Sequence, residues 1–233
     1  MVDFHTHILP NMDDGSHSPE ESLRMLDALQ TQGVDIVALT SHFDARRETI
    51  RSFLARREEA YARLRDALPP WAPLLRLGAE VAYQKGISTL ADLTELCLEG
   101  TNLLLLEMPF APWSRATVDE VIQLHASEKV TVMLAHIERY LMWQRPAVWR
   151  RLRDSGVVMQ SNAEFFFFPV VRILAASMLH KGKIDVLGTD CHNLTTRGAH
   201  MDWAFSNMEK RLGSDTIERL KKCSDALVQS REK

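Results

Sequence analysis

Seven short apolar runs constrain the fold of this chain more than any other feature of its sequence. They cover Val2 to His5, Asp35 to Thr40, Leu74 to Val81, Asn102 to Glu107, Val130 to His136, Val157 to Asn162, and Ile184 to Asp190. Hydrophobic residues follow one another in these runs instead of alternating with polar ones, which is typical of strands buried on both faces. The sequence therefore predicts seven parallel strands.

Helical patterns occupy most of the gaps between the runs. Ser18-Pro19-Glu20-Glu21 has an N-cap serine, a first-turn proline and a glutamate at the third helical position, and predicts a helix that ends at Gly33. The segment Thr117 to Glu120 has the spacing of a second capping box. Alternating strands and helices predict an α/β fold of one domain, residues 1–233, most easily closed as a seven-stranded barrel. An open doubly wound sheet is the alternative.

The composition excludes several classes of protein. A formal net charge of -3 provides no basic surface to offset phosphates, so we expect no nucleic-acid partner. No apolar stretch approaches the ~20 residues that cross a bilayer, and the start at Met1 lacks a signal-peptide pattern. We therefore expect no membrane insertion and a cytoplasmic location. The cysteines have no CxxC spacing, which argues against a thiolate zinc site or a disulfide framework; they are Cys97, Cys191 and Cys223.

Potential metal ligands stand at or just beyond the C-terminal end of most predicted strands. One predicted strand ends instead in the amide side chain of an asparagine. In chain order these residues are His5 with His7, His42, Glu80, Glu107, His136, Asn162, and Asp190 with His192. The C-terminal ends of parallel strands meet on one face, where α/β folds place their active sites. A single such residue is more often a surface or loop residue. Several carboxylates converging without cations would repel one another, so the pattern predicts a metal centre.

The predicted ligands are five imidazoles and four carboxylates: His5, His7, Asp14, His42, Glu80, Glu107, His136, Asp190 and His192. Nitrogen and oxygen donors of this kind suit manganese, iron or zinc. Nine ligands exceed the coordination of one ion, so the set predicts two or three divalent ions bridged by carboxylates, as in multi-metal hydrolases. The helical patterns predict surface or packing roles for the other histidines, His17, His125, His180 and His200.

The opening His5-Thr6-His7, followed by Asp13-Asp14-Gly15, resembles the first motif of the polymerase and histidinol phosphatase (PHP) superfamily. Later segments are similar to those of the bacterial manganese-dependent protein-tyrosine phosphatases of capsule and exopolysaccharide operons, the CpsB/CapC type. These segments are Gly78-Ala79-Glu80, Leu106-Glu107-Met108-Pro109, Ala135-His136-Ile137-Glu138-Arg139-Tyr140 and Thr189-Asp190-Cys191-His192-Asn193. The similarity runs from Met1 to about His200.

This resemblance implies a distorted (β/α)7 barrel of the TIM-like PHP type, with a trinuclear Mn2+ centre on its C-terminal face. By position, one ion would be held by His5, His7, Glu80 and Asp190, a second by Glu80, Glu107 and His136, and a third by Asp14, His42 and His192. Arg139 and Arg197 match arginines that bind the phosphate. The implied substrate is phosphotyrosine in the tail of a bacterial tyrosine autokinase that controls capsular or exopolysaccharide synthesis.

The charge of the predicted centre favours a phosphate monoester. Three divalent ions bring about +6 and four carboxylates about -4, which leaves a positive charge for a phosphate dianion, and Arg139 and Arg197 add to it. A metal-activated hydroxide would attack phosphorus in line with the departing phenolate, without a covalent enzyme intermediate. His42 or His192 could relay a proton if one of them were not fully committed to metal.

Three other functions stay open. Cys191 and Arg197 satisfy the C-x5-R spacing of cysteine phosphatases, although the residues between them lack the glycines of a phosphate-cradling loop. The same metal centre could serve histidinol phosphate, another small monoester or a nucleic-acid end. A non-catalytic metal-binding scaffold of polysaccharide assembly is the third, although a scaffold has no need of so many ligands.

Aromatic residues lie close in sequence to the predicted mouth of the site. They are Trp113, Tyr140, Trp143 and the run Phe165 to Phe168. Four adjacent phenylalanines cannot all face one way, so the pattern predicts core packing for most of these residues. Stacking of a phosphotyrosine ring on one of them is the alternative.

Overall fold

Short parallel strands form the centre of the protein. The computed structural model describes residues 1–127 and 129–229. In that part of the chain the strands are β1 Val2–Thr6, β2 Ile36–Leu39, β3 His42–Phe43, β4 Leu74–Leu77, β5 Glu80–Ala82, β6 Leu103–Glu107, β7 Thr131–Leu134, β8 Val158–Asn162 and β9 Val186–Gly188. All the strand pairings among them are parallel, as predicted.

Two neighbouring strands of the predicted set are interrupted at the same level. The second stops at Leu39 and resumes as β3, and the third breaks at Gly78 before β5. Leu39 pairs with Leu77 below the break, and His42 pairs with Glu80 above it. The strands therefore fall into two sheets, of order β1-β2-β4 and β3-β5-β6-β7-β8-β9. The apolar pattern continues through Gly78 and Ala79, which is why the sequence predicts one strand there.

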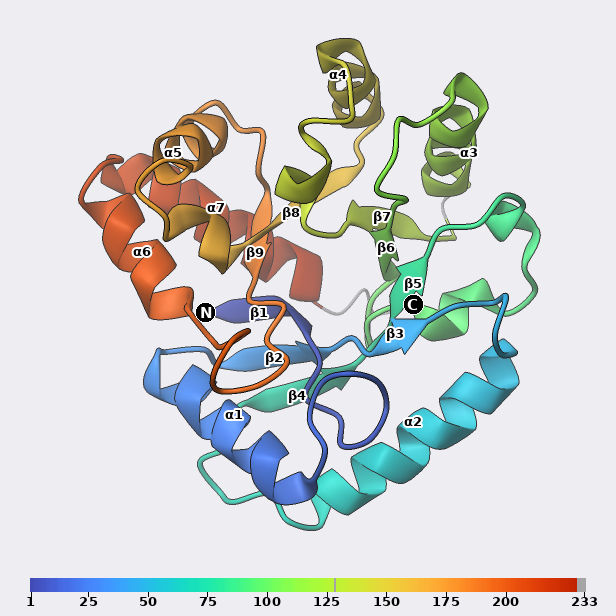
Figure 1. Ribbon diagram of the computed structural model, residues 1–233, viewed down its shortest axis with the longest axis vertical. Coiled ribbons are helices and arrows are strands. Elements are labelled where there is room, and N and C mark those ends of the chain that lie inside the picture. The colour runs from blue at the N-terminus through green and yellow to red at the C-terminus, as the bar shows by residue number, and fades with distance from the viewer. Residues whose placement is uncertain (128, 230–233) are drawn as a thin grey trace.

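The two sheets close into a ring between β9 and β1. The backbone N–H of Asp190 donates to the carbonyl of His5 at 2.7 Å, and the N–H of His7 donates to the carbonyl of Cys191 at 2.9 Å. Figure 1 looks into this ring, with the helices arranged around its outside. The predicted α/β architecture, a distorted (β/α)7 barrel, is confirmed.

The helices follow the strands around the barrel. They are α1 Pro19–Thr31, α2 Ile50–Arg65, α3 Arg115–Ala126, α4 Pro146–Asp154, α5 Arg172–His180, α6 Met201–Glu209 and α7 Ser214–Val228. Four short 3-10 helices are η1 Ile87–Thr89, η2 Leu93–Leu96, η3 Ile137–Tyr140 and η4 Ala163–Phe166. The unit after β5 contains only η1 and η2 where the others have an α-helix, which is one source of the distortion. Within the described residues, no helix has the length and apolarity needed to cross a membrane.

One predicted helix start is confirmed and the other is wrong. The Ser18 hydroxyl accepts from the backbone N–H of Glu21 at 3.2 Å, as expected for the N-cap of α1. Helix α3 starts earlier than predicted, because Ser114 accepts from the N–H of Thr117 at 3.1 Å. The carboxylate of Glu120 is then free to accept from the hydroxyl of Tyr83 at 2.8 Å and ties α3 to the loop after β5.

Alternation along the strands separates the outer core from the inside of the ring. Leu104 and Leu106 of β6 belong to the large apolar core, whereas Leu103 and Leu105 pack with Phe4 in a smaller cluster. Glu107, the last residue of β6, lies on the same face as Leu103 and Leu105 because side chains alternate along a strand. The apolar face of the strand therefore gives way to a carboxylate at its C-terminal end.

Candidate metal centre

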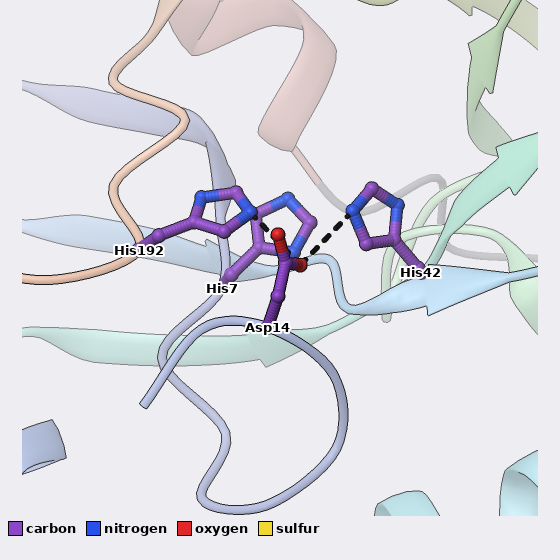
Figure 2. Close-up of side chains that lie close together, drawn as sticks. All are labelled: His7, Asp14, His42 and His192. Atoms are coloured by element: carbon purple, nitrogen blue, oxygen red, sulfur yellow. Dashed lines mark ion pairs between the residues drawn. The ribbon is translucent and has the colours of Figure 1, made fainter. Parts of the chain in front are cut away.

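All nine predicted ligands come together at the C-terminal ends of the strands. Their donor atoms form overlapping groups, each with its atoms within 4.8 Å of one another: His7, Asp14, His42 and His192; His5, His7 and Asp190; His5, Glu80 and His136; and His42, Glu80 and Glu107. Figure 2 shows the first group, in which the carboxylate of Asp14 reaches between His42 and His192 from the loop after β1. Shared members join the groups into one cluster.

Glu80 lies at the middle of the cluster. Its Oε2 is 3.1 Å from Nε2 of His5, 3.2 Å from Nε2 of His7 and 3.0 Å from Nδ1 of His42. Its Oε1 is 2.9 Å from Nε2 of His136, and that nitrogen is 3.6 Å from Oε1 of Glu107. A single buried carboxylate thus contacts four imidazoles, which is the position expected of a bridging ligand.

Asp190 links the cluster to both predicted phosphate-binding arginines. Nη2 of Arg197 lies 2.9 Å from both carboxylate oxygens of Asp190, and Nη2 of Arg139 donates to Oδ2. The amide of Asn162, the predicted strand-end residue of β8, donates to the same Oδ2 at 3.0 Å. Oδ1 of Asp190 is 3.5 Å from Nε2 of His5 and 3.4 Å from Nε2 of His7. The two arginines therefore converge beside the cluster.

Asp13, which is not among the predicted site residues, orients two of the predicted ligands, His7 and His42. Its Oδ2 is 2.8 Å from Nδ1 of His7 and accepts from the backbone N–H of His42 at 2.8 Å, and its Oδ1 accepts from the N–H of Gly15 at 3.0 Å. A Cβ on Gly15 would lie 2.0 Å from the carbonyl oxygen of His7, so only glycine fits. Each member of Asp13-Asp14-Gly15 thus has a separate task. Histidine ligands commonly use a carboxylate on the far ring nitrogen in this way.

Asp3 and Gln160 hold the backbone around the cluster and were also missed. Asp3 accepts from the N–H of Thr189 at 2.8 Å and from its hydroxyl at 2.6 Å, and burial raises the pKa of Asp3 to about 6. Oε1 of Gln160 accepts from the N–H of His136 at 2.7 Å. Asp3 lies two residues before His5 on β1, and this spacing on one strand face is the only sequence signal that pointed to it.

Burial and contacts between the groups shift the pKa values of the cluster in both directions. Burial lowers the pKa of His136, and burial together with the nearby His7 lowers the pKa of His192 to about 4. Burial opposes ionisation of Glu80 and Asp190, but His5 and the other imidazoles outweigh it and hold the pKa of both carboxyls well below the usual range. Burial opposes protonation of His7, but its contacts with Asp13 and Asp190 raise its pKa well above the usual range. Metal ions would displace that proton, because neutral imidazoles and ionised carboxylates are the forms that coordinate metals.

Several buried polar atoms of the cluster form no hydrogen bond of suitable geometry, although imidazole nitrogens lie within 3.2 Å of one of them. They are Oε2 of Glu80, Nδ1 of His136 and Nε2 of His192. Buried polar groups are costly when unsatisfied, and a cluster of them in a set of hard and borderline donors fits metal ions. The four remaining histidines, His17, His125, His180 and His200, belong to none of the ligand groups among the described residues.

The cluster is closed on one side and open on the other. The side chains of His5 and His7 are fully buried, whereas those of His42 and Asp14 are 40% and 64% exposed. Arg139 and Arg197 are each about one-third exposed. A substrate would therefore enter on the side where Asp14, His42 and the arginines lie.

Cys191→Ser should leave turnover within a few-fold of wild type, because the structure gives the Cys191 thiol no nucleophilic role. The side chain is fully buried, burial raises its pKa far above neutral pH, and Sγ donates to the carbonyl of Asn193 at 3.6 Å. Reactive cysteines are exposed thiolates. Steady-state kinetics with matched metal content measure the effect. A thousandfold loss with the metals still bound would support a cysteine phosphatase.

The aromatic residues follow the predicted division only in part. Trp113, Tyr140, Phe165 and Phe166 are buried, in agreement with core packing, whereas Trp143 and Phe168 are exposed. A ring that stacks on a predicted ligand belongs to a residue outside the predicted aromatic set, Phe110. Its ring lies 6.1 Å from that of His136 at an interplanar angle of 17°.

The barrel and its cluster define a class of protein: parallel α/β barrels with a cluster of metal-type ligands at the C-terminal ends of their strands. A model of the family described as "Capsular polysaccharide synthesis, CpsB/CapC" matches residues 1–227. The chain belongs to this family, which confirms the predicted resemblance.

Curated relatives and a solved structure agree with the family. The tyrosine-protein phosphatase YwqE of Bacillus subtilis (strain 168) is 27% identical over 237 residues, covering 99% of this chain and 92% of the relative. The tyrosine-protein phosphatase CpsB of Streptococcus pneumoniae is 26% identical over 238 residues, covering 94% of each chain. A chain from the crystal structures of YwqE and CpsB, described as unique metal-dependent tyrosine phosphatases, matches with a TM-score of 0.84, at 23% identity over 99% of this chain and 95% of that chain. This likeness shows the fold.

Proposed function

We propose that this protein is a metal-dependent protein-tyrosine phosphatase. The observation that carries the proposal is the cluster of nine metal-type ligands beside two arginines that meet at one carboxylate. The names of its relatives support the same activity, since those that span the chain are tyrosine-protein phosphatases. A small monoester such as histidinol phosphate is the alternative substrate, and no relative reported above is named for it.

The cluster would hold two to three divalent ions, with Glu80 between them. Mn2+ is the ion we propose, and the same nitrogen and oxygen donors are also compatible with Fe or Zn. When bound, such ions supply a water activated as nucleophile and positive charge for the phosphoryl oxygens. We assign the ligand roles to His5, His7, Asp14, His42, Glu80, Glu107, His136, Asp190 and His192.

The other steps belong to the chain's own side chains. Arg139 and Arg197 would bind the phosphate oxygens, since a planar guanidinium matches two oxygens at once. Asp13 keeps the ring of His7 oriented through Nδ1. Of the two histidines proposed to relay a proton, His42 is the more exposed, with 40% of its side chain accessible against 1% for His192. We therefore favour His42 for proton exchange with solvent.

We further propose that the substrate is a phosphotyrosine-containing protein, the tail of a bacterial tyrosine autokinase of capsule or exopolysaccharide synthesis. The family description supports this pathway. The cytoplasm is the proposed location, because ATP-dependent tyrosine phosphorylation takes place there. The free cysteines Cys97, Cys191 and Cys223 are compatible with a reducing compartment.

Chelation should reduce phosphotyrosine hydrolysis by at least about a hundredfold, and Mn2+ should restore it, because the nucleophile depends on the metal. The measurement is release of phosphate from a phosphotyrosine peptide, with histidinol phosphate assayed in parallel. Fe2+ and Zn2+ additions to the same chelated sample identify the most effective ion, and a sample dialysed without metal is the control. Full activity in metal-free enzyme would contradict the proposal, as would binding of metal without activity on either ester.

A further inference from the structure

Phe110 is a large apolar side chain that is exposed beside the metal centre. It follows Glu107, the last residue of β6, by three positions, and it is 51% exposed. Its ring stacks on the imidazole of His136, with centroids 6.1 Å apart and an interplanar angle of 17°, and it contacts the ring of Tyr140 in a tilted arrangement at 5.4 Å between centroids. About half of the surface of Phe110 is therefore open to solvent beside His136, a predicted metal ligand.

Hydrogen bonds fix the loop on both sides of Phe110. The hydroxyl of Tyr140 accepts from the backbone N–H of Met108 at 3.0 Å. The amide of buried Gln144 bonds twice, accepting from the N–H of Trp113 at 3.1 Å and donating to the carbonyl of Ala111 at 2.8 Å. The exposure of Phe110 is therefore built into a fixed backbone.

One short segment, His136 and helix η3, contains the arginine proposed to bind the phosphate and the two residues that contact Phe110. Helix η3 spans Ile137–Tyr140, so Arg139 stands in sequence between His136 and Tyr140, whose rings both contact Phe110. A phosphate held by Arg139 would thus have an aromatic surface next to it. An ester group attached to that phosphate meets a flat apolar ring, which favours another ring stacked or edge-on against it.

We infer that Phe110 is the platform for the phenyl ring of the substrate and that it selects aryl over alkyl phosphate monoesters. This inference rests on the proposed phosphatase function and specifies its substrate class. The platform gives no charge and no proton to the reaction. Phe110 contacts only the ring of the substrate, so its replacement weakens the binding of aryl ligands and leaves the binding of alkyl ligands unchanged.

The test compares Phe110→Leu and Phe110→Tyr with the wild type, all loaded with the same amount of Mn2+. Leucine keeps an apolar side chain over His136 but removes the ring, and tyrosine keeps the ring. The inhibition constants of benzylphosphonate and methylphosphonate measure binding at the ring subsite in the absence of hydrolysis. The second measurement is kcat/KM on phosphotyrosine and phosphoserine peptides of one sequence. Phe110→Leu should weaken inhibition by benzylphosphonate about tenfold and lower kcat/KM for the phosphotyrosine peptide by the same factor, which is the size of the effect expected from losing an aromatic pair.

Methylphosphonate inhibition and metal content should not change in Phe110→Leu, and Phe110→Tyr should match the wild type. If Phe110→Leu weakened inhibition by both phosphonates equally, or by neither, the inference would be overturned, since Phe110 would then only pack against His136. Trp71→Ala is the matched control, because Trp71 is 43% exposed but precedes β4 at the opposite ends of the strands. A wild-type enzyme that discriminates between the phosphonates but hydrolyses no phosphotyrosine would refute the proposed function alone.

Discussion

Glu80→Ala should abolish metal loading and activity together, with a loss of more than about a hundredfold. Loss of a residue that merely orients a ligand already costs about 10- to 100-fold, and Glu80 contacts four imidazoles of the cluster itself. Because the side chain is buried, the variant also leaves those imidazoles facing a cavity. Elemental analysis of the purified variant and phosphotyrosine turnover measure the two losses.

Two further variants separate the role of Glu80 from general damage to the fold. Glu80→Gln keeps the shape but not the charge, and it should lose most of the metal while retaining a cooperative melting transition. Glu120→Ala removes a glutamate that accepts hydrogen bonds from Tyr83 and Gly86 outside the cluster, and it should keep its metal. A Glu80→Ala protein with a full metal complement and a normal rate would show that the centre lies elsewhere.

Arg139→Ala and Arg197→Ala should each lower the turnover number by about a hundredfold or more while leaving metal content unchanged. Neither arginine belongs to a ligand group, and both converge on Asp190 at the open side of the cluster. Donors that strengthen as charge builds on phosphoryl oxygens act like those of an oxyanion hole, whose loss has an effect of this size. Turnover and inhibition by phosphate are recorded together under matched Mn2+.

Arg139→Lys should rescue only part of the activity, because lysine keeps the charge but lacks the planar fork that binds two oxygens. Arg151→Ala is a suitable control, since Arg151 pairs with Asp119 on the surface between α4 and α3. If both alanine variants keep wild-type turnover and wild-type inhibition by phosphate, the arginines are surface charges and the assigned phosphate site is wrong.

The convergence of the nine side chains was predictable because strand ends leave a clear signal, a polar residue directly after a buried apolar run. Glu107 and His136 follow this rule, and both lie in the cluster. The two-residue strand β3 was not predicted, because its backbone pairing with β5 depends on a break that the apolar pattern hides. The early start of α3 was missed because Ser114 and Thr117 both have a polar partner three residues later.

Residues that orient the site were harder to predict than residues that form it. Asp13 and Asp14 are adjacent and chemically identical, and only the folded loop shows that Asp13 supports His7 while Asp14 faces His42. Phe110 carries no local signal, since its place on His136 depends on two loops that follow different strands. Contacts of this kind arise from tertiary structure and have no counterpart in sequence periodicity.

The interruption of two adjacent strands divides the barrel wall along a seam, and the ligand cluster crosses that seam. His5 comes from β1 in the smaller sheet, whereas Glu80, Glu107 and His136 come from the strands of the larger one or their ends. Ions bound by these residues would link the two sheets to each other, in addition to the backbone hydrogen bonds between β1 and the segment after β9. Occupancy of the centre would then contribute to the rigidity of the whole wall, and the same ions would serve the architecture as well as the chemistry.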